Sequence, residues 1–144
     1  MTNSSEHPLK VFLCHSSGDK PAVRALYKIL VGRGIDAWLD EEKLLPGQEW
    51  QIEIPKAVQN SDAIIVCVSN KSITKEGYVQ KEIKFALDIA DIQPEGRIFV
   101  VPLKLEKCPV PRRLSNLHWL NYYERDGYFH LKRALAKRAQ EISV

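Results

Sequence analysis

The apolar segment DAIIVCVS, residues 62–69, constrains the fold of this chain more than any other stretch. It has the length of one strand and no polar alternation, which is typical of a strand buried on both faces of a parallel sheet. LKVFLCH, residues 9–15, is a second run of this kind. Because a strand buried on both faces needs helices on each side, we predict an α/β protein with residues 62–69 at the centre of its sheet.

Segments with helical periodicity alternate with the predicted strands along the chain. Strands are predicted at residues 9–15, 35–40, 62–69, 97–105 and 117–123, and helices at residues 20–31, 50–60, 78–93 and 127–142. This alternation implies right-handed crossovers and a five-stranded parallel sheet. The pattern suits a flavodoxin-like, three-layer domain with strand order 2-1-3-4-5 and helices on both faces. Residues 41–50, which contain Pro46-Gly47, are predicted to form a long loop.

Length and composition fit one ordinary globular domain. The 144 residues are 44% hydrophobic and 27% charged, with a net charge of +3. This weak charge, without a basic stripe, argues against direct contact with nucleic acid. No apolar run approaches the roughly 20 residues of a membrane-spanning helix, and the N-terminus has no signal-peptide core. Three cysteines without metal-ligand spacing indicate a reduced, cytoplasmic protein and no metal site.

The domain is expected to occupy most of the chain. Residues 1–8 are predicted to be a disordered lead-in, and residues 9–142 a single domain. The chain ends in EISV while its pattern is still helical. This ending fits an N-terminal module of a longer protein.

Polar residues are predicted to gather where the strand order reverses, between the first and third strands. In open α/β sheets, ligands bind in the crevice at this point. Three loops meet there, at residues 15–20, 40–50 and 69–77. Glu82 lies early in the predicted third helix, four residues after Tyr78, so both side chains should project from one helical face. The nearby candidates are Ser16, Ser17, Ser69, Trp38, Trp50, Asp40 and Lys43.

Each of these residues also has an ordinary structural interpretation. A glutamate in an early helical turn is usually a solvated residue favoured by the helix dipole. Trp38 can simply pack in the core, and Trp50 can anchor its helix to the sheet. Asp40 and Lys43 can form an exposed pair that contributes less than ~1 kcal/mol.

Several familiar chemistries lack their motifs in this sequence. A phosphorelay receiver needs an acidic pair after the first strand and an aspartate after the third, where this chain has His15-Ser16-Ser17 and Ser69. HSSGDK is neither a P-loop nor a dinucleotide-binding glycine motif. The four histidines have no metal-ligand spacing, and no nucleophile elbow accompanies a serine.

The ordered set of motifs resembles a TIR (Toll/interleukin-1 receptor) domain of the bacterial type. KVFLCHSSGDK is similar to the opening strand and box of that family, and WLDEEKLLPGQEW to its BB loop. YVQKEI resembles the segment that carries the family's catalytic glutamate. CPVPRRL and LHWLNYYERDGYFHLKRAL resemble its C-terminal third. The resemblance covers about residues 9–140.

The resemblance implies an enzyme that cleaves NAD+ between nicotinamide and ribose, with Glu82 as the catalytic carboxylate. NAD+ is then a substrate, and no cofactor is needed. One carboxylate suits this reaction because nicotinamide leaves as a neutral group without a general acid. The expected substrate contacts are His15, Ser16, Ser17, Trp38, Asp40, Lys43, Leu44, Trp50, Ser69 and Tyr78. Many active members have Trp where this chain has Tyr78, which keeps an aromatic ring.

The resemblance leaves the product and the biological setting open. Water as the nucleophile gives ADP-ribose, whereas an intramolecular nucleophile gives a cyclic isomer. Family members often self-associate through the loop that corresponds to residues 41–50, and bacterial ones are often linked to a sensor domain in anti-phage defence. A non-catalytic TIR module that only binds other TIR domains is the alternative function.

Overall fold

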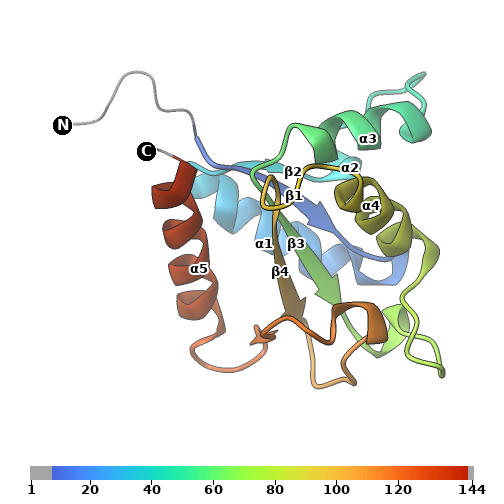
Figure 1. Ribbon diagram of the computed structural model, residues 1–144, viewed down its shortest axis with the longest axis vertical. Coiled ribbons are helices and arrows are strands. Elements are labelled where there is room, and N and C mark those ends of the chain that lie inside the picture. The colour runs from blue at the N-terminus through green and yellow to red at the C-terminus, as the bar shows by residue number, and fades with distance from the viewer. Residues whose placement is uncertain (1–7, 143–144) are drawn as a thin grey trace.

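Five parallel strands form one sheet in the order β2-β1-β3-β4-β5, as the sequence predicted. Figure 1 shows this sheet in the computed structural model, which describes residues 8–142. The predicted lead-in therefore lies, apart from Pro8, outside the described residues. The strands are β1 (Lys10–Cys14), β2 (Asp36–Trp38), β3 (Ala63–Val68), β4 (Phe99–Lys104) and β5 (Leu120–Asn121).

Helices cover both faces of the sheet, which makes three layers. The long helices are α1 (Lys20–Gly32), α3 (Trp50–Gln59), α4 (Lys81–Asp91) and α5 (Gly127–Ile142). Helices α1 and α5 pack on one face, and α3 and α4 pack on the other. Short helical turns complete the chain: η1 (Ser17–Asp19), α2 (Asp40–Lys43), η2 (Asn70–Ser72) and η3 (Arg112–Leu114). Within residues 8–142, no helix has the length and apolar character that crossing a membrane requires.

Strand β3 lies at the centre of the sheet and is buried along its whole length. Successive side chains of a strand point to opposite faces, so β3 contributes to both halves of the core. Ile65 packs in the cluster that includes α1 and α5 residues, and Ile64 packs in the cluster that includes α3 and α4 residues. This double burial explains why the segment is apolar without alternation.

Two local predictions are wrong. Helix α4 begins at Lys81, so Tyr78 precedes it and does not share a helical face with Glu82. Tyr78 instead belongs to a turn in which Ile73 and Val79 pair antiparallel and Gly77 has a φ of 81°. The start of the predicted 41–50 loop is also helical, because Asp40–Lys43 forms the single turn of α2.

The C-terminal helix α5 is fixed to the sheet by a buried arginine and by a close backbone contact. Arg138 donates from Nε to the carbonyl oxygen of Asp62 (2.9 Å) and from Nη2 to that of Arg97 (2.8 Å). At the other end of α5, Gly127 lies directly against the backbone of Tyr122. A Cβ atom at residue 127 would overlap the Tyr122 carbonyl group.

Substituting Gly127 therefore tests how closely α5 approaches the end of β5. We expect Gly127→Ala to lower the free energy of unfolding by about 1–3 kcal/mol, because backbone atoms must shift to admit the methyl group. Gly32→Ala is the matched control, since a Cβ atom there meets nothing within 4 Å. It should stabilise α1 by about 0.4–1 kcal/mol. Urea unfolding of both variants measures the difference, and equal stabilities would contradict the close contact.

Candidate functional site

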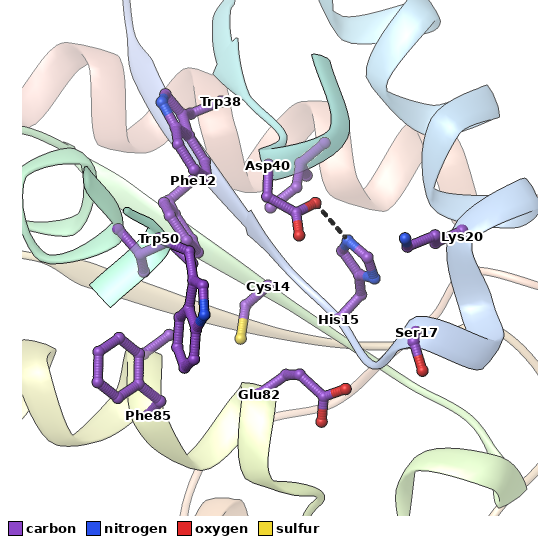
Figure 2. Close-up of a pocket in the computed structure, with 13 residues that line it drawn as sticks. Phe12, Cys14, His15, Ser17, Lys20, Trp38, Asp40, Trp50, Glu82 and Phe85 are labelled. Carbon is purple, nitrogen blue, oxygen red and sulfur yellow. Dashed lines mark hydrogen bonds and ion pairs between the residues drawn. The ribbon is translucent and has the colours of Figure 1, made fainter. Parts of the chain in front are cut away.

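A pocket of about 270 Å³ opens at the carboxyl ends of β1 and β2, beside the first turn of α4. This is the switch point of the sheet, where β1 lies between β2 and β3. Figure 2 shows that its lining comes from β1, β2, the following turns, and helices α1, α3 and α4. The lining residues are Phe12, Leu13, Cys14, His15, Ser17, Lys20, Trp38, Asp40, Trp50, Ile54, Glu82, Phe85 and Ala86.

Aromatic rings form one wall of the pocket. Phe12 and Trp38 stack with their ring centroids 5.0 Å apart and an interplanar angle of 10°. Trp50 meets Phe85 edge to face, with centroids 5.2 Å apart. In Figure 2 these four rings line the side opposite His15 and Lys20. Such a wall offers a flat apolar surface on which a planar ring can stack.

An ion pair between the buried His15 and the half-buried Asp40 forms the opposite wall. The Nδ1–H of His15 donates to the carbonyl oxygen of Ser16 (2.7 Å), and Nε2 lies 3.3 Å from Oδ1 of Asp40. Both ring nitrogens therefore face acceptors, and this geometry favours the doubly protonated imidazolium. Oδ1 of Asp40 also accepts from the backbone N–H of Glu41 (2.7 Å).

The pKa values of the pair move apart accordingly. Burial opposes the charge on His15, but the hydrogen bonds to Asp40 and Ser16 outweigh it and raise the pKa above the ordinary 6.5. The hydrogen bond from His15 lowers the pKa of Asp40 below 3.8, against the effect of burial. Both members of the pair are therefore charged between pH 3.8 and 6.5, the ordinary pKa values of the two side chains.

Glu82 presents an exposed carboxylate to the pocket from the first turn of α4. In residues 8–142, it accepts no protein hydrogen bond and forms no ion pair. Figure 2 shows its oxygens on the same side of the pocket as Ser17 and His15. The helix N-terminus favours its negative charge. The site thus contains one carboxylate that is already neutralised, Asp40, and one that is available to a ligand, Glu82.

Cys14 and Lys20 also line the pocket, and they differ in charge. Burial raises the pKa of the Cys14 thiol, and the charges of Asp40 and Glu82 raise it further, so Cys14 stays neutral. Lys20 lines the pocket at the start of α1, and no carboxylate of residues 8–142 lies within ion-pair distance of its ammonium group. Lys20 is therefore a cation available to an anionic group of a ligand.

A buried aspartate, Asp19, connects the loop after β1 to the loop after β3. Asp19 accepts from the hydroxyl of Ser69 at 2.8 and 3.0 Å, and from the hydroxyl of Ser16 at 3.2 Å. These bonds join the loop after β1 to the loop after β3. Ser69 also caps η2 by accepting from the backbone N–H of Lys71 (3.2 Å).

The structure brings together only part of the residues that the sequence singled out. Six of them line the pocket: His15, Ser17, Trp38, Asp40, Trp50 and Glu82. Ser16 and Ser69 are buried behind it with Asp19, whereas Lys43 and Leu44 lie outside its lining. Tyr78 also lies outside, exposed, with the guanidinium of Arg112 5.2 Å from its ring centroid.

Sequence reasoning missed several pocket residues: Phe12, Cys14, Lys20, Ile54 and Phe85. Their apolar or helical positions are equally typical of core and surface residues, and nothing in the local pattern separates a pocket wall from a core. Metal binding has no support from the described residues, since no three His, Cys, Asp or Glu side chains among them could hold an ion.

Comparison with known proteins identifies a family. The family model described as "TIR domain" matches residues 11–135. No curated protein matches the sequence. Among solved structures, the TIR domain of the Toll-related receptor TRR-2 from Hydra magnipapillata aligns with a TM-score of 0.70 and 20% identity. The alignment covers 89% of this chain and 98% of that one.

Two further structures share the fold. A metazoan TIR-STING receptor from C. gigas, solved with 2',3'-cGAMP, aligns with a TM-score of 0.66 and 20% identity over 92% of this chain and 40% of that one. A prokaryotic SEFIR domain aligns with a TM-score of 0.65 and 19% identity, covering 87% and 90% of the two chains. At these identities, the similarity establishes the fold alone.

The pH dependence of the His15–Asp40 pair follows from the directions of its pKa shifts. Because the pKa of His15 is raised in the folded protein, its imidazolium stabilises the fold fully below pH 6.5. This contribution is lost as the pH rises through the pKa of His15 in the folded state. Because the pKa of Asp40 is lowered in the folded protein, its carboxylate stabilises the fold fully above pH 3.8. This contribution is lost as the pH falls through the pKa of Asp40 in the folded state. Both contributions are complete between those limits.

We therefore expect Asp40→Asn to destabilise the fold most between about pH 4 and 6.5, with a smaller effect above the raised pKa of His15. In the variant, His15 is still buried but has lost the negative charge of Asp40, so the pKa of His15 should fall. An NMR titration of the imidazole protons measures this pKa directly. The exposed His118 and His130 serve as internal controls. An unchanged His15 pKa would show that Asp40 does not hold the proton.

Proposed function

The chain belongs to the TIR domain family, and we propose that it is an NAD+ nucleosidase that cleaves the bond between nicotinamide and ribose. One observation carries this proposal: the unpartnered carboxylate of Glu82 faces a pocket whose other wall is aromatic. Such a pocket suits a planar cationic ring attached to a sugar. NAD+ carries this group in its nicotinamide ribose.

The reaction needs few groups from the protein. The bond between ribose C1′ and the nicotinamide nitrogen breaks, and its electron pair stays on that nitrogen, so nicotinamide leaves neutral. Positive charge develops on the sugar, and the Glu82 carboxylate stabilises it electrostatically. Attack by water at C1′, with loss of a proton, gives ADP-ribose. Attack by an adenine nitrogen or a ribose hydroxyl of the same molecule gives a cyclic isomer.

Other pocket residues have distinct roles in this proposal. Trp50 and Phe85 provide the surface on which nicotinamide stacks, and Lys20 is placed to meet a phosphate group. The His15 imidazolium neutralises Asp40, so Glu82 supplies the negative charge that the ribose meets. This division of roles would explain why the pocket contains two carboxylates although the reaction needs one.

The pocket is small, and the loop beside it is exposed. Its volume of about 270 Å³ is near the lower end of the roughly 300–1,000 Å³ of typical ligand sites. The loop after α2 presents Leu45, which is 64% exposed, close in sequence to Trp50 at the pocket. We propose that this loop packs on a neighbouring TIR domain and that the assembled pair completes the nucleotide site.

A non-catalytic interaction module is the second candidate function. It is favoured by the exposed apolar side chains of Leu45, Trp50 and Ile52, which follow one another along the 41–52 segment. In both functions, signalling in cytoplasmic (anti-phage) defence with a linked sensor domain is the proposed setting. The C. gigas receptor, which combines TIR and STING and was solved with a cyclic dinucleotide, supports that arrangement.

The charge of Glu82 is the direct test of catalysis. We expect Glu82→Gln to reduce nicotinamide release by about 10²–10³-fold, because it removes a preorganised charge and keeps the side-chain shape. Chromatography of NAD+ incubations measures this release and identifies the second product. Glu53→Gln is the matched control, since Glu53 lies in the first turn of α3 and outside the pocket lining. Undiminished turnover by Glu82→Gln would assign the reaction to another group.

Enforced clustering tests the role of the 41–50 loop. We expect the activity per chain to rise when tagged protein is crowded on nickel-chelating vesicles. Leu45→Ser should reduce that rise at least about fivefold, the factor that about 1 kcal/mol of contact energy represents. Ile92→Ser is the control, because Ile92 is a 76% exposed apolar residue at the far end of α4. Equal activity in dilute and clustered samples would rule out activation by assembly.

A further inference from the structure

Asp19 occupies the N-cap position of α1, but its side chain does not cap that helix. An N-cap aspartate ordinarily accepts from a backbone N–H in the first turn of its own helix. The Asp19 carboxylate instead accepts from the hydroxyl of Ser69, at 2.8 and 3.0 Å, and from the hydroxyl of Ser16, at 3.2 Å. The stabilisation that capping offers is thus given up for a bond to a loop 50 residues away.

The Asp19 carboxylate is buried without a cation beside it. Asp19 is 7% exposed, and no Lys, Arg or His of residues 8–142 lies within ion-pair distance of it. Burying a carboxylate is costly unless hydrogen bonds compensate it. Hydrogen bonds to a charged acceptor are about twice as strong as those between neutral groups. The bond between Asp19 and Ser69 is therefore a strong, directional link between the loops after β1 and β3.

A continuous path of hydrogen bonds leads from Ser69 to the start of α4. The N–H of Ser69 donates to the hydroxyl of Ser72 (2.8 Å), and this hydroxyl donates to the carbonyl oxygen of Ser69 (3.0 Å). The carbonyl oxygen of Ser72 accepts from the N–H of Gln80 (2.9 Å), which is the N-cap residue of α4. Because Ser72 and Gln80 flank the turn closed by the Ile73–Val79 bridge, the path bypasses that turn.

Glu82 lies two residues after Gln80, in the first turn of α4. The body of α4 is held by apolar side chains such as Leu87, and apolar contacts are not directional. The hydrogen-bonded N-cap therefore fixes how the first turn is placed at the pocket. This placement matters for a reaction, since a shift of about 1 Å at a reacting group can lower a rate by about 10²-fold.

We propose that Asp19 is a positioning residue for Glu82. Through Ser69, Ser72 and Gln80, it holds the first turn of α4 at a set distance from the loop after β1, which lines the pocket opposite the aromatic rings. This inference rests on the proposed function, because Glu82 is the carboxylate assigned to that reaction. Asp19 is not among the residues that line the pocket, so it acts through Glu82 and does not contact the substrate.

Steady-state kinetics of NAD+ cleavage test this role. We expect Asp19→Asn and Ser69→Ala each to lower kcat about tenfold and to change KM less than about twofold, because the substrate contacts remain while the Glu82 carboxylate shifts. Ser61→Ala is the matched control and should leave kcat unchanged. Ser61 is also buried and its hydroxyl donates to the carbonyl oxygen of Ala57 (2.7 Å), but it lies outside the pocket lining.

The Glu82→Gln background separates positioning from general destabilisation. If Asp19 acts through Glu82, adding Asp19→Asn should lower the residual kcat of Glu82→Gln by less than about twofold. Equal losses in both backgrounds would show a merely structural role and overturn the inference. Full kcat in Asp19→Asn and Ser69→Ala, beside an impaired Glu82→Gln, would also overturn it and would leave the proposed function intact.

Amide hydrogen exchange tests the path without relying on catalysis. Asp19→Asn should lower the protection of the Gln80 N–H at least about tenfold, and that of the Leu87 N–H in the middle of α4 less than about twofold. If the unsubstituted chain releases no nicotinamide, the proposed function fails and the exchange alone decides. Lost protection at Gln80 then supports the link from Asp19 to α4, and unchanged protection overturns it.

Discussion

The burial of β3 on both faces is the constraint on which the rest of this structure depends. A strand with no exposed face needs helices above and below it, and its neighbours must be reached by crossovers that carry those helices. Parallel strands then end at the same edge of the sheet. His15 and Asp40, which lie 25 residues apart, meet there because β1 and β2 end side by side.

At that edge of the sheet, Asp40 and Glu82 carry carboxylates in different electrostatic surroundings. Asp40 is paired with the His15 imidazolium, and this pairing moves their pKa values in opposite directions. Glu82 has no protein partner among the described residues and is free to meet a ligand. The aromatic wall and Lys20 give the same pocket a stacking surface and a cation. Together these features suit a molecule that combines a planar cationic ring, a sugar and phosphate.

Hydrophobic periodicity predicted the strands and the layers because it reports burial directly, and the strand order followed from the flavodoxin-like pattern that this alternation suits. The sequence also placed Glu82 and His15 correctly at the switch point, since that position follows from topology. It failed for Tyr78, where a turn closed by the Ile73–Val79 bridge delays the start of α4. It also missed Asp19, whose bonds to Ser16 and Ser69 depend on loops 50 residues apart. Neither feature has a local periodic signal.

The proposed reaction requires the nicotinamide ribose of NAD+ to lie at the switch point of the sheet, beside Glu82. The most direct measurement is a crystal structure of the chain with a carbocyclic NAD+ analogue that cannot be cleaved. We expect the nicotinamide ring against Trp50 and Phe85, and the ribose hydroxyls within about 2.6–3.2 Å of the Glu82 carboxylate. An analogue bound away from the switch point, with Glu82 still turned to solvent, would contradict the proposed reaction.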